Sequence, residues 1–141
     1  MATKFGTPEW AQLLVKEVNG SSEYRNAAAG WGNGYNGNVM LVIEPDAKLS
    51  KGLNLLIRLS KGACHGAEFT DDPHHPEVGF ALRAPYSLWK DILERRSLAA
   101  TAILTGKMKV DGDKMTLLKH TAAHRAMVSC CSAIDTDFDL A

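Results

Sequence analysis

The chain has 141 residues, of which 45% are hydrophobic and 23% charged, a balance that excludes a mainly disordered chain and predicts one globular domain with one core. Sixteen basic and sixteen acidic residues give a formal charge of zero, so no overall positive field attracts nucleic acid, and we expect no nucleic-acid partner. The longest purely apolar run, at 39–43, is far shorter than the ~20 residues of a membrane-spanning helix.

Two helices are predicted near the N-terminus. Thr7 is suited to cap the first helix and Pro8 to occupy its first position. Four apolar residues then share one helix face: Trp10, Leu13, Leu14 and Val18. Asn19-Gly20 ends this helix, and Ser22 is suited to cap a second one over 24–29.

Four strands are predicted next. The segments 39–43 and 53–59 are apolar, and the second alternates apolar with polar positions. A tight turn at 60–62 leads into a third, weaker strand through Phe69, after which two prolines interrupt the chain. The fourth strand covers 78–84, where three residues are expected to face inward: Val78, Phe80 and Leu82.

Two more helices follow these strands. Pro85 is suited to begin the first, in which apolar residues repeat at three- and four-residue intervals: Tyr86, Trp89 and either Ile92 or Leu93. Ser97 is suited to cap a second helix over 98–104, and Gly106 ends it.

The last elements are a strand and a helical region. The strand covers 107–111, with Met108 and Val110 on one side, and Asp113 is suited to cap the helical region. Four residues form one apolar stripe there: Met127, Cys130, Cys131 and Ile134. Strands followed by helices are typical of an α+β fold with the helices on one face of the sheet.

The cysteine pattern and the first residues bear on compartment. Cys64, Cys130 and Cys131 are an odd number, and the last two are adjacent, which predicts reduced thiols rather than a disulfide scaffold. The opening MATKFGTPEW has neither a basic nor an apolar signal region, so we expect a cytoplasmic protein.

The glycine-rich loop 30–38 contains a G-x-G-x-x-G match through Gly32, Gly34 and Gly37. In dinucleotide-binding folds this motif lies between a strand and the helix whose N-terminus faces the pyrophosphate. Here a helix precedes the glycines and a strand follows them, so we interpret the segment as a connecting loop and expect no nucleotide cofactor.

Three further groups of residues were weighed as sites. His120 and His124 are four residues apart, but Thr121 stands where the H-E-x-x-H motif has its glutamate, so a solvated basic face is favoured over a metal site. The cluster at 71–75, with two aspartates and two histidines, is interpreted as a surface loop. Cys64-His65 are strand neighbours that point to opposite faces, which argues against a nucleophile and base pair.

The segment from Gly79 to Asp113, GFALRAPYSLWKDILERRSLAATAILTGKMKVDGD, resembles the sterol carrier protein family of the second type and its stand-alone prokaryotic members. The part with the highest specificity is GKMKVDGD at 106–113. The resemblance covers 39–120 best, so we expect a single domain over 1–141, with helices and the glycine-rich loop at 1–38 and a helix and tail at 121–141.

The resemblance implies a five-stranded, mostly antiparallel sheet whose helices enclose an apolar tunnel for a fatty acid, acyl-CoA, phospholipid or sterol-like ligand. It implies no cofactor and no catalytic residues, and from the motifs above we also expect no metal. Carried over by position, seven residues would line the tunnel: Phe80, Leu82, Trp89, Leu93, Leu104, Met108 and Val110. The final DLA differs from the S-K-L-like tripeptide of peroxisomal members, so peroxisomal delivery is not predicted.

Two functions from the sequence remain open beside lipid binding. The same fold with a filled core would act as an interaction or accessory subunit, and the C-terminal apolar stripe would then meet a second copy in a homodimer rather than cap the tunnel. A metal-dependent enzyme using His120 and His124, or the His74-His75 loop, is the weaker alternative. Contact with a membrane surface is compatible with the lipid-binding hypothesis.

Overall fold

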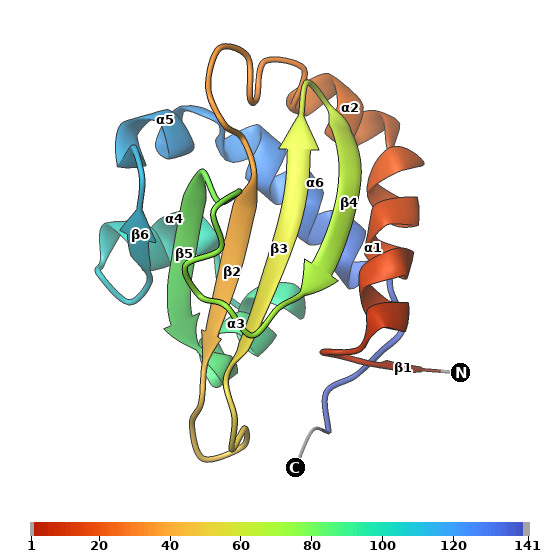
Figure 1. The fold of residues 1–141 in the computed structure, drawn as a ribbon, viewed down its shortest axis with the longest axis vertical. Coiled ribbons are helices and arrows are strands. Elements are labelled where there is room, and N and C mark those ends of the chain that lie inside the picture. The colour runs from red at the N-terminus through yellow and green to blue at the C-terminus, as the bar shows by residue number, and fades with distance from the viewer. Residues whose placement is uncertain (1, 140–141) are drawn as a thin grey trace.

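The computed structural model describes residues 2–139 and has a five-stranded sheet with the strand order β4-β3-β2-β5-β6 (Figure 1). The sheet strands are β2 (Val39–Glu44), β3 (Leu53–Ser60), β4 (Ala63–Phe69), β5 (Phe80–Pro85) and β6 (Lys109–Asp111). The helices are α1 (Pro8–Asn19), α2 (Ser22–Ala27), α3 (Tyr86–Leu93), α4 (Ala99–Leu104), α5 (Lys114–Lys119) and α6 (Thr121–Ser132). The α+β class and the five-stranded, mostly antiparallel sheet are confirmed.

One pairing in the sheet is parallel. β2 pairs antiparallel with β3, and β3 with β4, whereas β2 and β5 run parallel, with Val39 opposite Phe80. The β3–β4 turn has positive φ angles at Lys61 (52°) and Gly62 (84°). A Cβ at Gly62 would lie 2.7 Å from the Arg25 carbonyl oxygen, so this turn packs directly on the end of α2.

The two faces of the sheet bury different side chains because strand residues alternate in direction. Leu41, Ile57 and Leu82 belong to the main core, which the helices cover, while Met40 and Leu56 form a small cluster on the opposite face. In Figure 1 the connection from β4 to β5 crosses that opposite face in front of β2 and β3. This segment, residues 70–79, therefore covers the second face.

Polar contacts hold the covering segment in place. Glu77 accepts hydrogen bonds from Arg58 Nη2 at 2.9 Å, and its carbonyl oxygen accepts from the side-chain amides of Asn36 and Asn38 at 3.0 Å each. Val78 packs against the small cluster on the second face, so the expectation that it faces inward with Phe80 is wrong. The reason is a kink before β5, where the N–H groups of Gly79 and Phe80 both donate to the Asn38 carbonyl.

Some helix boundaries also differ from the expectations. Ser21, not Ser22, caps α2, because its Oγ accepts from the Tyr24 N–H at 3.0 Å. Leu98 is the N-cap residue of α4, so Ser97 does not cap it. The final helical region divides at His120 because the Leu117 carbonyl accepts from the His124 ring at 2.9 Å and from the His120 N–H at 3.2 Å.

A second, very short sheet joins the two ends of the described chain. β1 (Thr3–Lys4) pairs parallel with β7 (Thr136–Asp137). Strands of two residues show no recognisable sequence pattern, so this pairing was not predicted. Beside it, Phe5 contacts Trp10 edge-on, with ring centroids 4.8 Å apart. Within residues 2–139 no helix has the length and apolar character needed to cross a bilayer.

Candidate ligand cavity

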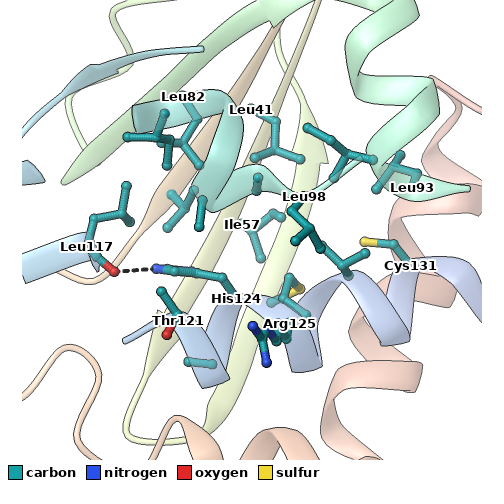
Figure 2. A pocket seen from close by; sticks show the side chains of 18 of the residues that line it. Leu41, Ile57, Leu82, Leu93, Leu98, Leu117, Thr121, His124, Arg125 and Cys131 are labelled. Atoms are coloured by element: carbon teal, nitrogen blue, oxygen red, sulfur yellow. Dashed lines mark hydrogen bonds between the residues drawn. The ribbon is translucent and has the colours of Figure 1, made fainter. Parts of the chain in front are cut away.

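An apolar cavity of about 240 Å³ lies between the helix-covered face of the sheet and helices α3, α4, α5 and α6 (Figure 2). It exceeds the roughly 150 Å³ apolar cavity that admits a benzene ring. It approaches the lower end of the roughly 300–1,000 Å³ of small-molecule sites. The structure therefore leaves space for a hydrophobic ligand where a filled core would leave none.

The floor of the cavity is built by three adjacent strands. Leu41 on β2, Ile57 on β3 and Leu82 on β5 line it, and all three belong to the buried core. They share one face of the sheet because Leu41 is opposite Leu82 in the parallel pairing, while Ile57 lies two residue pairs from Leu41 along the antiparallel ladder, opposite Val39. The alternation in the sequence thus determines an entirely apolar floor.

Two helices supply opposite walls. Trp89, Ile92 and Leu93 line the cavity from α3, and Trp89 is held by a hydrogen bond from its Nε1 to the Val42 carbonyl at 3.1 Å. Ala123 lines it from α6, and its small side chain leaves the volume that a leucine there would fill.

The α6 wall continues with Cys131. Burial raises the pKa of its thiol to about 12, so the group is a neutral thiol at physiological pH. It contributes a weakly polar surface to the cavity rather than a reactive thiolate.

A cluster of aromatic rings closes one end. Trp31 lines the cavity, and the rings of His120 and His124 pack edge-on against it at centroid distances of 5.3 and 5.4 Å. The expectation of a solvated basic face at these histidines is therefore wrong. Burial lowers the pKa of His124, and since its Nε2 donates to the Leu117 carbonyl, the neutral ring keeps Nδ1 as an acceptor.

The glycine-rich loop positions Trp31 by close packing. The Trp31 Nε1 donates to the Gly37 carbonyl at 2.8 Å. A Cβ at Gly37 would lie 2.9 Å from the Leu59 carbonyl oxygen and from Gly32 Cα. The glycine at this position is therefore required by contact with the neighbouring backbone.

The mouth of the cavity lies between the segment before α4 and the first turns of α6. Arg95, Leu98 and Arg125 line it and are exposed, with Ser97 and Thr121 partly exposed between them. Arg95 has a left-handed backbone (φ 64°), and its Nη2 donates to Ser129 Oγ at 2.6 Å. Two guanidinium groups thus stand at the rim of an apolar interior, as Figure 2 shows for Arg125.

Of the seven residues proposed from the sequence to line a tunnel, three line the cavity and four lie elsewhere. Leu82, Trp89 and Leu93 line the cavity. The other four lie outside its lining: Phe80 packs on Trp31 at 5.0 Å, Met108 is buried in the core, Val110 is half-buried and Leu104 is 69% exposed.

None of the seven proposed lining residues is on α6, although capping of the tunnel by the C-terminal helix was one of the alternatives left open. Ala123, Met127 and Cys131 line the cavity at four-residue spacing, which is one helix face. The predicted stripe contained Met127 and Cys131, so the signal was present. Cys130 and Ile134 of that stripe lie in the core but not in the lining.

The other candidate sites do not assemble into reactive centres. Within residues 2–139 no group of three or more His, Cys, Asp or Glu side chains is placed to hold a metal ion. Burial raises the pKa of Cys64, and His65 contacts Ser60 Oγ at 2.7 Å instead of the thiol.

Comparison with known proteins agrees with this geometry. The profile of the SCP-2 sterol transfer family matches residues 12–124. A crystal structure of sterol carrier protein 2 is 27% identical, with a TM-score of 0.80 over 93% of this chain and 99% of that one. A conserved hypothetical protein of Thermus thermophilus, named as a candidate sterol carrier protein, is 26% identical, with a TM-score of 0.80 over 97% and 94% of the two chains.

A more distant structure shows the fold alone. Sterol carrier protein 2 of Yarrowia lipolytica, in its apo form, is 13% identical, with a TM-score of 0.54 over 86% of this chain and 88% of that one. No curated protein matches the chain at a significant level. From the family profile and the two structures above 25% identity, the chain belongs to the SCP-2 sterol transfer family, a family of lipid-binding proteins.

Proposed function

We propose that the protein binds, and transfers without chemical change, a single-chain lipid with an anionic head, such as a fatty acid. The observation that carries the proposal is the apolar cavity of about 240 Å³ with Arg95 and Arg125 at its mouth. The acyl chain lies against Leu41, Ile57 and Leu82, and the head group lies at the rim.

The size of the cavity explains why a head-group contact matters. At roughly 30 Å³ per methylene-sized group it accepts about eight methylenes. At ~0.8 kcal/mol each, their burial contributes about 6 kcal/mol before costs. Association costs at least about 4 kcal/mol, so the chain alone gives weak binding, and a charge-assisted contact at the rim is needed for useful affinity.

The rim favours a carboxylate or phosphate head over an uncharged sterol. A guanidinium presents paired N–H donors that match either anion, and such charge-assisted bonds are stronger than neutral ones. Arg95 uses one donor on Ser129 and retains others. We therefore place fatty acids before sterols among the ligands that the sequence left open.

Displacement of a fluorescent fatty acid tests this proposal, together with native mass spectrometry of the protein as purified. Ala100 lines the mouth from α4, so Ala100→Trp fills the opening and should lower fatty-acid affinity at least about tenfold. Ala122 lies outside the lining and is exposed on α6, so Ala122→Trp is the matched control and should bind as the wild type does.

The accessory-subunit alternative gives the opposite result. A protein with a filled core takes up no fatty acid, so the wild type and both tryptophan variants would give the same result, with no fatty-acid binding. The lipid-binding proposal would be refuted if the wild type showed no saturable displacement of the fluorescent fatty acid, and if mass spectrometry detected no lipid after the purified protein was denatured and extracted.

A further inference from the structure

Positive charge is concentrated in the segment that forms the cavity mouth. Residues 95–128 contain seven basic and two acidic side chains, a net charge of +5 in a chain whose total is zero. The basic residues are Arg95, Arg96, Lys107, Lys109, Lys114, Lys119 and Arg125. Both acidic residues are engaged: Asp111 pairs with Arg83 at 3.2 Å, and Asp113 accepts from the first turn of α5.

The same segment exposes large apolar side chains. Among residues 2–139 four large hydrophobic residues are exposed, and three of them belong to this segment: Leu98 (60%), Leu104 (69%) and Met115 (64%). The fourth, Leu13, is on α1 and is only 36% exposed. Exposed apolar side chains gathered in one region, beside polar neighbours, are typical of an interaction surface.

Helix geometry makes these residues continuous with the mouth. Leu98 itself lines the cavity. Leu104 lies one helical turn after Ala100, and Met115 lies one turn before Leu118. Ala100 and Leu118 both line the cavity. In Figure 1, α4 and α5 lie on the same side of the molecule, beyond β5.

Four of the cations belong to the same surface. Arg95 and Arg125 line the mouth. On the short helix α5, Lys114 is four residues from Leu118, and Lys119 is four residues from Met115, so both flank its apolar side. We call the resulting set the mouth surface: Leu98, Leu104 and Met115 with Arg95, Lys114, Lys119 and Arg125.

We propose that the mouth surface docks on a lipid bilayer that carries anionic head groups. Exposed leucine and methionine side chains enter the boundary between head groups and acyl chains, and nearby lysines and arginines are attracted to the negative surface. A second copy of this chain fits less well, because a two-fold interface would place two positively charged surfaces against each other. The proposal depends on charge and exposure, and not on what occupies the cavity.

Co-sedimentation with vesicles tests the docking. The wild type should bind vesicles of equimolar phosphatidylcholine and phosphatidylglycerol at low salt, and bind vesicles of pure phosphatidylcholine far more weakly. Raising the ionic strength to ~0.15 M should weaken the binding because the Debye length falls to about 8 Å.

Two variants separate the contributions of charge and apolar contact. Lys114→Gln with Lys119→Gln should lower the partition coefficient about fivefold per lysine, or roughly 25-fold together. Leu98→Ser with Leu104→Ser and Met115→Ser should lower it at least about tenfold. Since all five side chains are exposed, thermal melts should show that the variants stay folded.

Matched controls lie elsewhere on the molecule. Lys48 and Lys51, exposed in the loop between β2 and β3, give the control Lys48→Gln with Lys51→Gln, and Leu13→Ser is the apolar control. Both controls should bind as the wild type does. Equal binding to the two kinds of vesicle, or equal losses in the control variants, would overturn the proposal.

A different occupant would show itself in the same samples. If the wild type is a dimer in solution, binds neither vesicle, and the apolar triple variant is monomeric, the surface belongs to a second copy, and membrane docking is refuted. Fatty-acid displacement by the same variants is measured separately, so failure of docking and failure of lipid binding are distinguishable.

Discussion

Replacing one floor residue of the cavity by alanine should change ligand preference more than a matched change in the packed core. Leu41 lines the cavity, while its direct partner across the β2–β3 ladder, Leu55, is fully buried outside the lining. Leu41→Ala and Leu55→Ala remove the same three carbon atoms from neighbouring positions on one face. The pair therefore isolates the effect of facing the cavity.

The two variants should differ in stability. Leu55 is surrounded by core side chains, so Leu55→Ala should lower the free energy of unfolding by about 3–5 kcal/mol. Leu41 faces space that already lacks packing partners on one side, so Leu41→Ala loses fewer contacts and should cost only about 2–3 kcal/mol. Urea unfolding of the lipid-free protein measures both values.

The ligand preference should shift only for Leu41→Ala. Removing three carbons makes room for about three more methylenes, each worth ~0.8 kcal/mol or roughly fourfold in affinity. Displacement by saturated fatty acids of increasing length should therefore show an optimum about three carbons longer than in the wild type. An unchanged optimum, or the same shift in Leu55→Ala, would refute the assignment of Leu41 to the cavity floor.

Three other predictions follow from local geometry. The pKa of His124 is lower in the folded state than its unfolded value of about 6.5, so the unfolded state binds a proton first as the pH falls. The free energy of unfolding should therefore decrease as the pH drops below about 6.5. His124→Gln should make this decrease with pH smaller, as measured by urea unfolding at a series of pH values. Gly62→Ala should lower the free energy of unfolding by about 1–3 kcal/mol in thermal melts, because its Cβ would meet the Arg25 carbonyl oxygen. Gly34 has the same φ of 84° but open space around it, so Gly34→Ala should lower the stability less. Equal losses of stability in the two variants would contradict this explanation. The three cysteines are buried with raised pKa values, so a thiol reagent at neutral pH should react with them only after denaturant is added.

The fold was predictable from local patterns. Thr7 does cap α1, with Pro8 at its first position, and the alternation over 53–59 does form a strand with Leu55, Ile57 and Leu59 on the core face. These features depend on neighbouring residues and on one buried face, which the sequence displays directly.

The cavity was less predictable because alternation identifies a face but not what packs against it. Phe80 and Leu82 share one face of β5, yet Leu82 meets open space while Phe80 meets Trp31, which arrives from a loop far away in sequence. His120 and His124 show the same effect. Lys119, Thr121 and Arg125 beside them are polar, yet both rings pack against Trp31, which is distant in sequence.

The parallel pairing of β2 and β5 has a consequence for the order of folding. The β3–β4 hairpin joins residues close in sequence, whereas Val39 meets Phe80 only after that hairpin and the covering segment 70–79 have been placed. Closing such a long loop costs chain entropy before any contact repays it, so this pairing should form late. Because Leu82 arrives with β5, the floor of the cavity is completed only at that step, and mutations in β5 should affect the unfolding rate more than the folding rate.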